Sequence, residues 1–113
     1  MKEIKAVVDP GMLHRVMDAL HALPHFPGVT VSDAQGQGRG EGAGGKYVPG
    51  GNALAFTRQM KLEIFCTDQE CDQIVDAIRK AAHVGQAGRG IIRVLSLERV
   101  LRVSTSEEND NAV

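Results

Sequence analysis

Apolar and polar positions in the first third of the chain alternate with two different periods, which predict a strand, a helix and a second strand. Residues 4–8 form a short β-branched run typical of a strand. Asp9-Pro10 then resembles a helix N-cap followed by proline at the first helical position. Apolar residues recur at helical spacing after it, at Met12, Leu13, Val16, Leu20 and Leu23. Pro24 and Pro27 end that helix, and a strand over residues 29–36 is expected next.

The rest of the chain repeats this arrangement after a glycine-rich segment that ends near Thr57. Residues 60–66 alternate between apolar and mostly charged positions, so they predict a strand with one buried face. Thr67-x-x-Glu70 is a capping-box pattern at the start of a second helix. A fourth strand is expected over residues 91–95. The last predicted elements are a short strand marked by Val100, Leu101 and Val103, and a polar tail from Ser104.

The resulting order, β-α-β-β-α-β, predicts an α+β fold of the ferredoxin-like kind. Such a sheet carries both helices on one face. We expect its other face to display Ile4, Val8, Leu62 or their neighbours. An apolar sheet face needs a cover, and the simplest cover is another copy of the chain.

Glycine is concentrated between the two middle strands, where residues 36–51 hold eight of the thirteen glycines. Gly40-x-x-x-x-Gly45-Lys46 fits most of a Walker phosphate loop, and Gly40-x-Gly42-x-x-Gly45 fits the dinucleotide fingerprint. Both motifs require a helix to follow. Tyr47 and then Val-Pro-Gly-Gly follow instead, and these residues do not start a helix. The segment is therefore interpreted as a long loop.

Composition limits the classes of function. The 113 residues carry a net charge of −1, with 42% hydrophobic and 24% charged positions, which is typical of one globular domain without a general attraction to nucleic acid or membranes. No apolar run is as long as a membrane span, and the N-terminus shows no signal region. We therefore expect a cytoplasmic protein without membrane insertion. Cys66 and Cys71 suggest no disulfide framework.

Several segments in this order resemble the PII signal-transduction family, over about residues 1–108. "MKEIKAVVDPGMLHRVMDAL" resembles its first strand and helix, and "GVTVSDAQGQGRG" its second strand and the entry to its T-loop. "KLEIFCTDQECDQIVDAIRKAA" resembles its third strand and second helix. "GQAGRG" stands where the family has its B-loop, and "ERVLRVST" resembles its final strand. The chain is identified as a divergent member.

The resemblance implies a homotrimer that binds adenine nucleotides in the clefts between subunits. It also implies a T-loop, about residues 37–57, that changes shape with the ligand and docks on a target enzyme or membrane transporter. The B-loop would span about residues 83–90, inside one domain of residues 1–104, and residues 105–113 would be a flexible acidic tail. A loop that a ligand remodels benefits from glycine, which has little intrinsic structure. The protein would be a nitrogen-regulatory signalling protein, not an enzyme, with no prosthetic group.

The resemblance also implies which residues bind the nucleotide. Glycines of the B-loop would direct backbone N–H groups at the phosphates, with a charge-assisted contact from Arg89. The base of the T-loop would face the phosphates, residues on the second and third strands would lie near the base, and Arg102 would reach the phosphates of a neighbouring subunit. The full set is Thr30, Gly36, Gln37, Gly38, Arg39, Ile64, Phe65, Gly85, Gly88, Arg89, Gly90 and Arg102.

This sequence departs from the family pattern at several of the polar positions. The usual B-loop lysine is Ile91, the second arginine of the last strand is Ser104, and the lysine near the T-loop exit is Gln59. Gly40 replaces a glutamine that helps to hold magnesium. These losses favour ADP or AMP over Mg-ATP and weaken the case for 2-oxoglutarate, with bicarbonate a candidate second effector. Uridylylation is not expected, because Asn52 stands near the modified tyrosine's position.

Other interpretations of the same residues remain open. The B-loop glycines also fit an ordinary turn between helix and strand, and Arg102 also fits a solvated or ion-paired strand position. His14, His21 and His25 cluster near the first helix, so a trimeric metal-binding protein linked to metal tolerance or efflux is the alternative function. An enzyme with groups at subunit junctions would have Arg89, His83 and Glu63 as its candidates.

Overall fold

The computed structural model describes residues 1–38, 56–83 and 90–113 and confirms the α+β architecture and the β-α-β-β-α-β order. The strands are β1 (Lys2–Val8), β2 (Thr30–Gly36), β3 (Thr57–Cys66) and β4 (Ile91–Ser96). The helices are α1 (Leu13–His21) and α2 (Asp68–Ala82), with short 3-10 helices η1 (Pro10–Met12) and η3 (Asn109–Asn111). The described elements therefore match the predicted ones in type and order, with the exception of the last strand.

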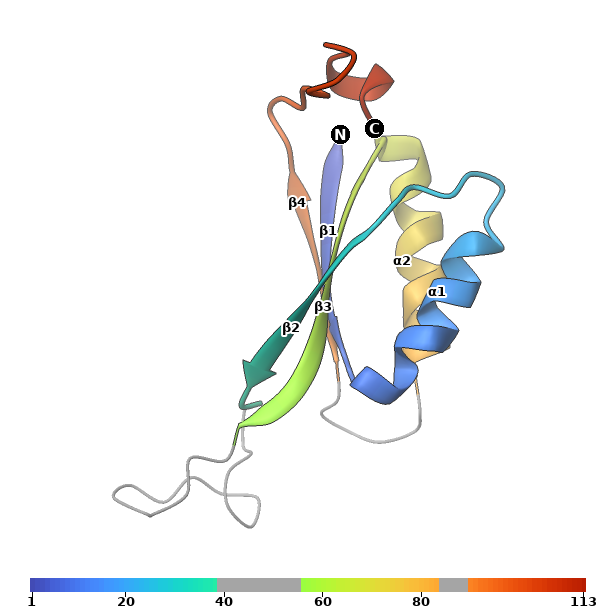
Figure 1. Cartoon of the computed structure of the whole chain (residues 1–113). Coiled ribbons are helices and arrows are strands. Elements are labelled where there is room, and N and C mark those ends of the chain that lie inside the picture. The colour runs from blue at the N-terminus through green and yellow to red at the C-terminus, as the bar shows by residue number, and fades with distance from the viewer. Residues whose placement is uncertain (39–55, 84–89) are drawn as a thin grey trace.

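The four strands form one antiparallel sheet in the order β2-β3-β1-β4. Ile4 of β1 lies opposite Ile64 of β3 and Val94 of β4, which fixes the register of the three strands. Both helices pack on the same face of this sheet (Figure 1). The antiparallel order brings the ends of β1 and β2 and the starts of β3 and β4 to the same end of the sheet. The glycine-rich connections from β2 to β3 and from α2 to β4 join the strands at this end.

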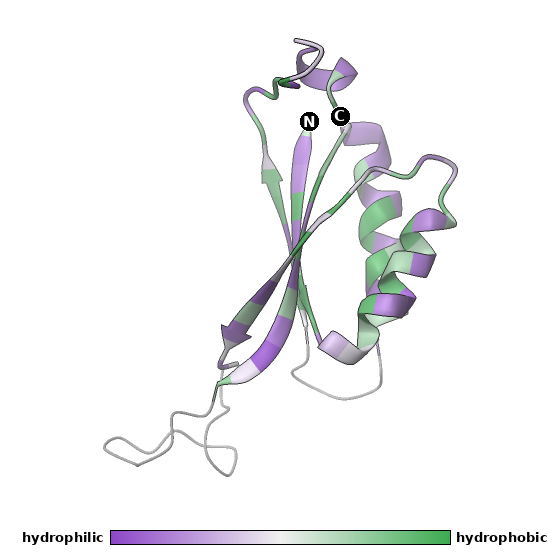
Figure 2. Cartoon of the chain, viewed as in Figure 1, coloured by the Kyte–Doolittle hydropathy of each residue, from purple (hydrophilic) through white to green (hydrophobic). Residues whose placement is uncertain are grey.

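The core lies between the sheet and the two helices and is aliphatic. Figure 2 shows that each helix has a hydrophilic and a hydrophobic side, and the buried residues of the helices are Val16, Leu20, Cys71, Ile74 and Ile78. The sheet contributes Ile4, Ala6, Val8, Met60, Leu62, Ile64 and Cys66. Of the two sets that the sequence left open for the uncovered face, the structure selects the sequence neighbours, because the helices cover Ile4, Val8 and Leu62 themselves.

That uncovered face, which we call the open face, carries the alternate residues of the same strands. Residues paired directly across an antiparallel ladder lie on the same side. One row therefore holds Thr30, Glu63, Lys5 and Arg93. Large apolar side chains lie toward the two ends of the face, where Phe65, Leu95 and Ile91 are 44%, 40% and 60% exposed. The open face thus combines a charged middle with apolar margins.

The predicted helix starts differ from the observed ones in their hydrogen bonds. Asp9 makes no side-chain cap, and Pro10 begins a 3-10 turn that precedes α1. At α2, the Thr67 hydroxyl donates to the Glu70 carboxylate over 3.0 Å instead of capping a backbone N–H, so the capping box is not formed. Of the described helices, α2 is the longest at 15 residues, and none is long and apolar enough to cross a membrane.

The start of the chain is joined to the β3–α2 junction. The N-terminal amine donates to Asp68 Oδ1 over 2.7 Å, and this hydrogen bond lowers the pKa of the Asp68 carboxyl. Cys66 ends β3 in the core, as predicted, and Cys71 is also buried on α2. Burial raises the pKa of the Cys66 thiol to about 12, with a further contribution from the neighbouring Cys71. The Cys66 thiol is therefore held neutral in the folded chain.

The C-terminal segment corrects one prediction. The expected strand at residues 100–103 is not formed, because Leu101 makes only a single bridge to Glu108. Residues 105–113, for which the sequence predicts a flexible tail, fold back through this bridge and η3 and bury Ala112. Val103 is 95% exposed and Leu101 is 50% exposed, so two of the three apolar residues that suggested a strand lie largely at the surface.

Candidate functional site

An open groove of about 620 Å³ lies at the end of the sheet where β1 and β2 end and β3 and β4 begin. Gly36, Gln37 and Gly38 enter it from the end of β2. Gly90 and Ile91 enter it from the start of β4. Val7 of β1 and Gln59 of β3 complete the lining. Segments more than fifty residues apart in the sequence, the predicted T-loop base and the end of the predicted B-loop, therefore share one concave surface.

Glycine is required at Gly90 for a local reason. Its φ is +91°, in the region that other residues rarely adopt. A Cβ atom there would also lie 3.2 Å from the backbone oxygen of Val7. Gly90 thus lets the chain pass close to β1 as β4 begins, and this close approach closes one side of the groove.

The other side of the groove depends on the approach of β2 to β3. A Cβ atom on Gly36 would meet Oε1 of Gln59 at 2.6 Å, so any larger residue would displace the Gln59 side chain. Gln59, where the family pattern has lysine, therefore lies directly beside Gly36 at the base of the predicted T-loop. The described lining of the groove contains no charged side chain. Its polar groups are the backbone and the amides of Gln37 and Gln59.

Two of the predicted base-contacting residues lie far from this groove in the same chain. Thr30 and Phe65 are exposed on the open face, near the start of β2 and the end of β3. Thr30 is six residues from Gly36 along one strand, a separation of about 20 Å. Ile64 is only 1% exposed and packs in the core, so its side chain contacts no ligand on the open face. One chain does not bring the predicted set together.

Arg102 forms a third separate position. Its Nη2 donates to the backbone oxygen of Ala112 over 2.7 Å, within the C-terminal segment. The backbone N–H of Leu97 bonds to Met1, so this segment begins where β1 begins, at the end of the sheet opposite the groove (Figure 1). A ligand in the groove that also contacts Arg102 would therefore have to take that arginine from a second chain.

Four of the predicted binding residues lie outside the described residues, namely Arg39, Gly85, Gly88 and Arg89. The same is true of Gly40, Tyr47 and Asn52, and of most of the predicted T-loop and B-loop. The described groove is therefore formed by the residues that flank these two loops.

The predicted binding set omits three residues of the groove, Val7, Gln59 and Ile91. In the sequence Val7 is only part of the first strand, and Gln59 and Ile91 are only positions where the family pattern has lysine. For Val7 and Ile91 a signal exists in the alternation of β1 and β4. Val7 is paired with Ile91 and stands on the face opposite to the buried Val8. Strand period therefore places both on the open face at its glycine-rich edge.

The histidines do not meet at one place. His21 stacks on Phe26, with ring centroids 3.9 Å apart, and His25 Nδ1 lies 3.0 Å from Glu70 Oε2. His14 is exposed on α1. Within residues 1–38, 56–83 and 90–113, no group of three His, Cys, Asp or Glu side chains is arranged to hold a metal ion. Glu63, an alternative catalytic candidate, lies 3.8 Å from the ammonium of Lys61.

Comparison with known proteins gives one consistent result. A family model described as nitrogen regulatory protein P-II matches residues 1–107. Among individual proteins, the nitrogen regulatory protein P-II of Pasteurella multocida is 36% identical over 113 residues, which is the whole of both chains. The P-II protein of Azospirillum brasilense is 34% identical and nitrogen regulatory protein GlnK of Escherichia coli is 31% identical, each over both full lengths.

Proposed function

The chain belongs to the nitrogen regulatory protein P-II family, and on that premise we propose that it senses an adenine nucleotide bound between subunits and passes this state to a target protein. Members of the family are signal-transduction regulators and not enzymes. They bind adenine nucleotides and act as trimers on their targets. The proposal concerns which nucleotide this chain binds, which residues bind it, and how the signal leaves.

The observation that carries the proposal is the groove that unites Gly36–Gly38 with Gly90. Glycine-rich backbone that turns its N–H groups toward a cavity can hold phosphate oxygens without a helix. The positive φ of Gly90 and the close approach of Gly36 to Gln59 give the two segments the shape that such a cradle needs. Arg39, Gly85, Gly88 and Arg89 would extend it on either side.

The groove's electrostatics favour a nucleotide with fewer phosphates. Its described lining has no cation, and Gln59 and Ile91 stand where the family pattern has lysine. A charged hydrogen bond to phosphate is worth about 1.5–3 kcal/mol, so two missing lysines would reduce the affinity for a triphosphate most. ADP or AMP is therefore the proposed ligand in preference to Mg-ATP.

The separation of the predicted residues supports a site shared between chains. Phe65 and Thr30 lie at the opposite end of the open face from the groove, a distance of about 20 Å, since β2 runs from Thr30 to Gly36. Arg102 lies in the C-terminal segment, which follows β4 at that same opposite end. In a homotrimer, the groove of one subunit would face these residues of the next. The base would stack near Phe65, and Arg102 would approach the phosphates.

The proposed signal leaves through residues 37–57, the T-loop. A nucleotide that contacts Gly38 and Arg39 in only one arrangement of this loop shifts the loop population by that difference in affinity. The target would be an enzyme or a membrane transporter in the cytoplasm, with bicarbonate as the candidate second effector. The alternative function, metal binding, has no observation in its favour among the described residues.

Calorimetric titration with ATP, ADP and AMP, with and without magnesium and bicarbonate, tests the proposal. We expect micromolar binding of ADP or AMP, weaker binding of Mg-ATP, and no turnover of any of them. Arg89→Ala should weaken binding about tenfold, whereas Arg15→Ala, on the exposed side of α1, should leave it unchanged. Absence of heat with every nucleotide would reject the proposal, and zinc and copper titrations of the chain and of His14→Ala would follow.

A further inference from the structure

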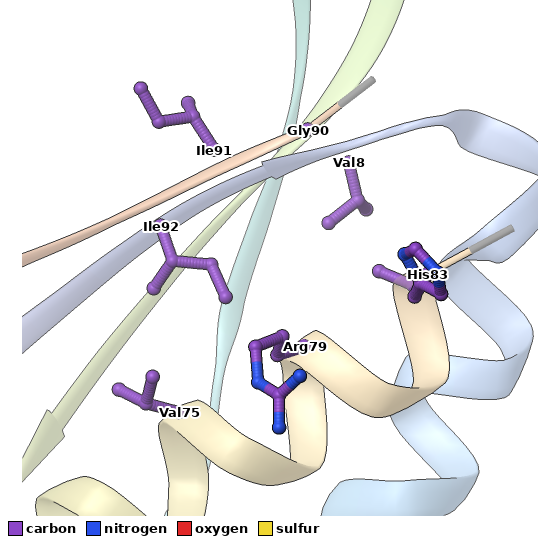
Figure 3. A pocket seen from close by; sticks show the side chains of 8 residues that line it. Val8, Val75, Arg79, His83, Gly90, Ile91 and Ile92 are labelled. Atoms are coloured by element: carbon purple, nitrogen blue, oxygen red, sulfur yellow. The ribbon is translucent and has the colours of Figure 1, made fainter. Parts of the chain in front are cut away.

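A second pocket, of about 310 Å³, lies on the other side of β4 from the groove, between the sheet and the C-terminal half of α2. Val8 and Ile92 point into it from β1 and β4, while Ile91 points away (Figure 3). Val75 and Ala82 of α2 complete its apolar wall. Val8 is 2% exposed, so the pocket reaches the edge of the core.

The only polar side chains among the described residues that line this pocket are Arg79 and His83. They are four residues apart, on the side of α2 that also presents Val75. The side chain of Arg79 is 62% exposed, and its guanidinium lies 3.7 Å from the Asp76 carboxylate, beyond hydrogen-bond distance, so among the described residues it keeps N–H donors for a ligand at the mouth. No carboxylate belongs to the part of the lining that the structure describes. The pocket is therefore apolar inside and basic at its rim.

An apolar pocket with a basic rim selects for an anion that carries an apolar tail. The planar guanidinium matches a carboxylate with two parallel hydrogen bonds, and the His83 imidazole can add a third donor. Arg79 and Lys80 also offset the partial negative charge at the C-terminal end of α2, which would otherwise repel an anion. We propose that this pocket binds a medium-chain monocarboxylate, with its head group on Arg79 and its alkyl chain between Val8, Val75 and Ile92.

The volume limits the ligand's size. A space of 310 Å³ equals about ten water volumes, which suits a ligand of about eight to ten non-hydrogen atoms such as hexanoate. So small a ligand should bind with a Kd on the order of 1 mM. Each further methylene that enters the apolar part should improve affinity about threefold to fourfold, until the pocket is full.

The pocket shares two of its lining residues with the groove. Gly90 and Ile91 contribute to both the pocket and the groove, so a carboxylate and a nucleotide would contact the same two residues, at the entry to β4, from opposite sides. Coupling between the two sites rests on the proposed function, whereas binding of the carboxylate does not. The test therefore uses the full-length protein without nucleotide.

The probes are butanoate, hexanoate and 1-hexanol, followed by backbone amide shifts in NMR titrations. We expect hexanoate to shift the amides of Val8, Val75 and Ile92 and to bind about tenfold more tightly than butanoate. Arg79→Gln should weaken hexanoate binding at least about fivefold without loss of folding, because that side chain is exposed. Lys80→Gln is the matched control, being the next residue on α2 but no part of the lining, and should bind like the unaltered chain.

Three outcomes would overturn the assignment. The first is an absence of localised shifts up to about 10 mM hexanoate. The second is equal weakening by Arg79→Gln and Lys80→Gln, which would indicate general charge attraction. The third is equally tight binding of 1-hexanol, insensitive to Arg79→Gln, which would make the pocket an apolar site without anion selectivity. Each outcome is independent of whether the groove binds a nucleotide.

Discussion

The two faces of the sheet are built from the same strands and differ in almost every physical property. On β1 and β3, the covered face presents Ile4, Leu62 and Ile64, each at most 1% exposed. The open face presents the residues between them, including Lys5 and Glu63, with Phe65 at its margin. Of two adjacent residues in one of these strands, one therefore lies in the aliphatic core and the other on the charged open face.

The two faces also differ in whether the chain's own helices cover them. The covered face is completed by α1 and α2, whose buried residues fill the space above it. The open face has no such layer among the described elements, and large apolar side chains remain exposed at its ends. Substitutions on the two faces should therefore affect different measurements: the free energy of unfolding on one face, and assembly or ligand binding on the other.

The largest effect is expected from Leu62→Ala on the covered face. Leu62 is fully buried, so the substitution removes apolar contacts and leaves a cavity that costs about 2–5 kcal/mol of the free energy of unfolding. Lys61→Ala, one residue away on the open face, is the matched control and should cost well under about 1 kcal/mol. Urea unfolding at a fixed protein concentration measures both. Equal losses would show that the two faces are not separate in energy.

Assembly should respond next, to Glu63→Lys on the open face. Lys5 lies opposite Glu63, and Arg93 lies opposite Lys5, so the substitution would leave a row of three cations. Light scattering should show a mass that falls from three copies to one, while the far-ultraviolet circular dichroism of the fold stays unchanged. Asp72→Lys on exposed α2 makes the same charge change and should keep the trimer. A trimer that survives Glu63→Lys would place the interface elsewhere.

A smaller effect is expected in the groove. Gln59→Lys would place a cation beside Gly36 and should tighten Mg-ATP binding about tenfold, with less gain for AMP. Gln35→Lys, on β2 but outside the groove lining, provides the control for a general gain of positive charge. Calorimetry measures the affinities of each variant for Mg-ATP and for AMP, and their ratio is compared between the variants. If both variants gained equally, the groove would not be the phosphate site.

The last prediction concerns the pH dependence of stability and a residue of the covered face, Cys66, whose effect is absent near neutral pH. Burial raises the folded-state pKa of Cys66 from 9.0 to about 12. The unfolded chain therefore loses this proton first, so the contribution to stability is complete below pH 9.0 and is lost as the pH rises toward 12. Cys66→Ala should show a shallower decline of the unfolding free energy over that range than the unaltered chain. Identical slopes would contradict the assignment of the titration to Cys66.

Much of the covered face was predictable from the sequence because it depends on local periods. The alternation at Met60, Leu62, Ile64 and Cys66 predicted the buried side of β3, and the helical spacing of Val16 and Leu20 predicted the buried stripe of α1. For β1 the sequence did not decide between Ile4 and Val8 and their neighbours. Apolar residues fall on both sides of that strand, at Val7 as well as at Ile4, Ala6 and Val8, so alternation alone does not reveal which residues face the helices.

The site was only partly predictable for a related reason. The resemblance to the family named Gly36, Gly38 and Gly90, and the structure brings these into one groove. It also named Thr30, Phe65 and Arg102, which the fold of a single chain keeps apart from the groove. Val7, Gln59, Ile91 and the Arg79 pocket are absent from the predicted set. Their significance lies in which strand and helix they adjoin, and sequence spacing does not report that.

By itself the sequence determined the identity and order of the elements, the aliphatic character of the core and the concentration of glycine between the middle strands, because each follows from neighbours along the chain. The tertiary structure decided which face of β1 is dry, that Leu101 bridges Glu108 instead of joining a strand, and that β4 separates a groove from a pocket. These depend on register and on contacts between segments far apart in sequence. A shift of one residue in register reverses every face assignment on a strand, and only packing against the helices selects between the two.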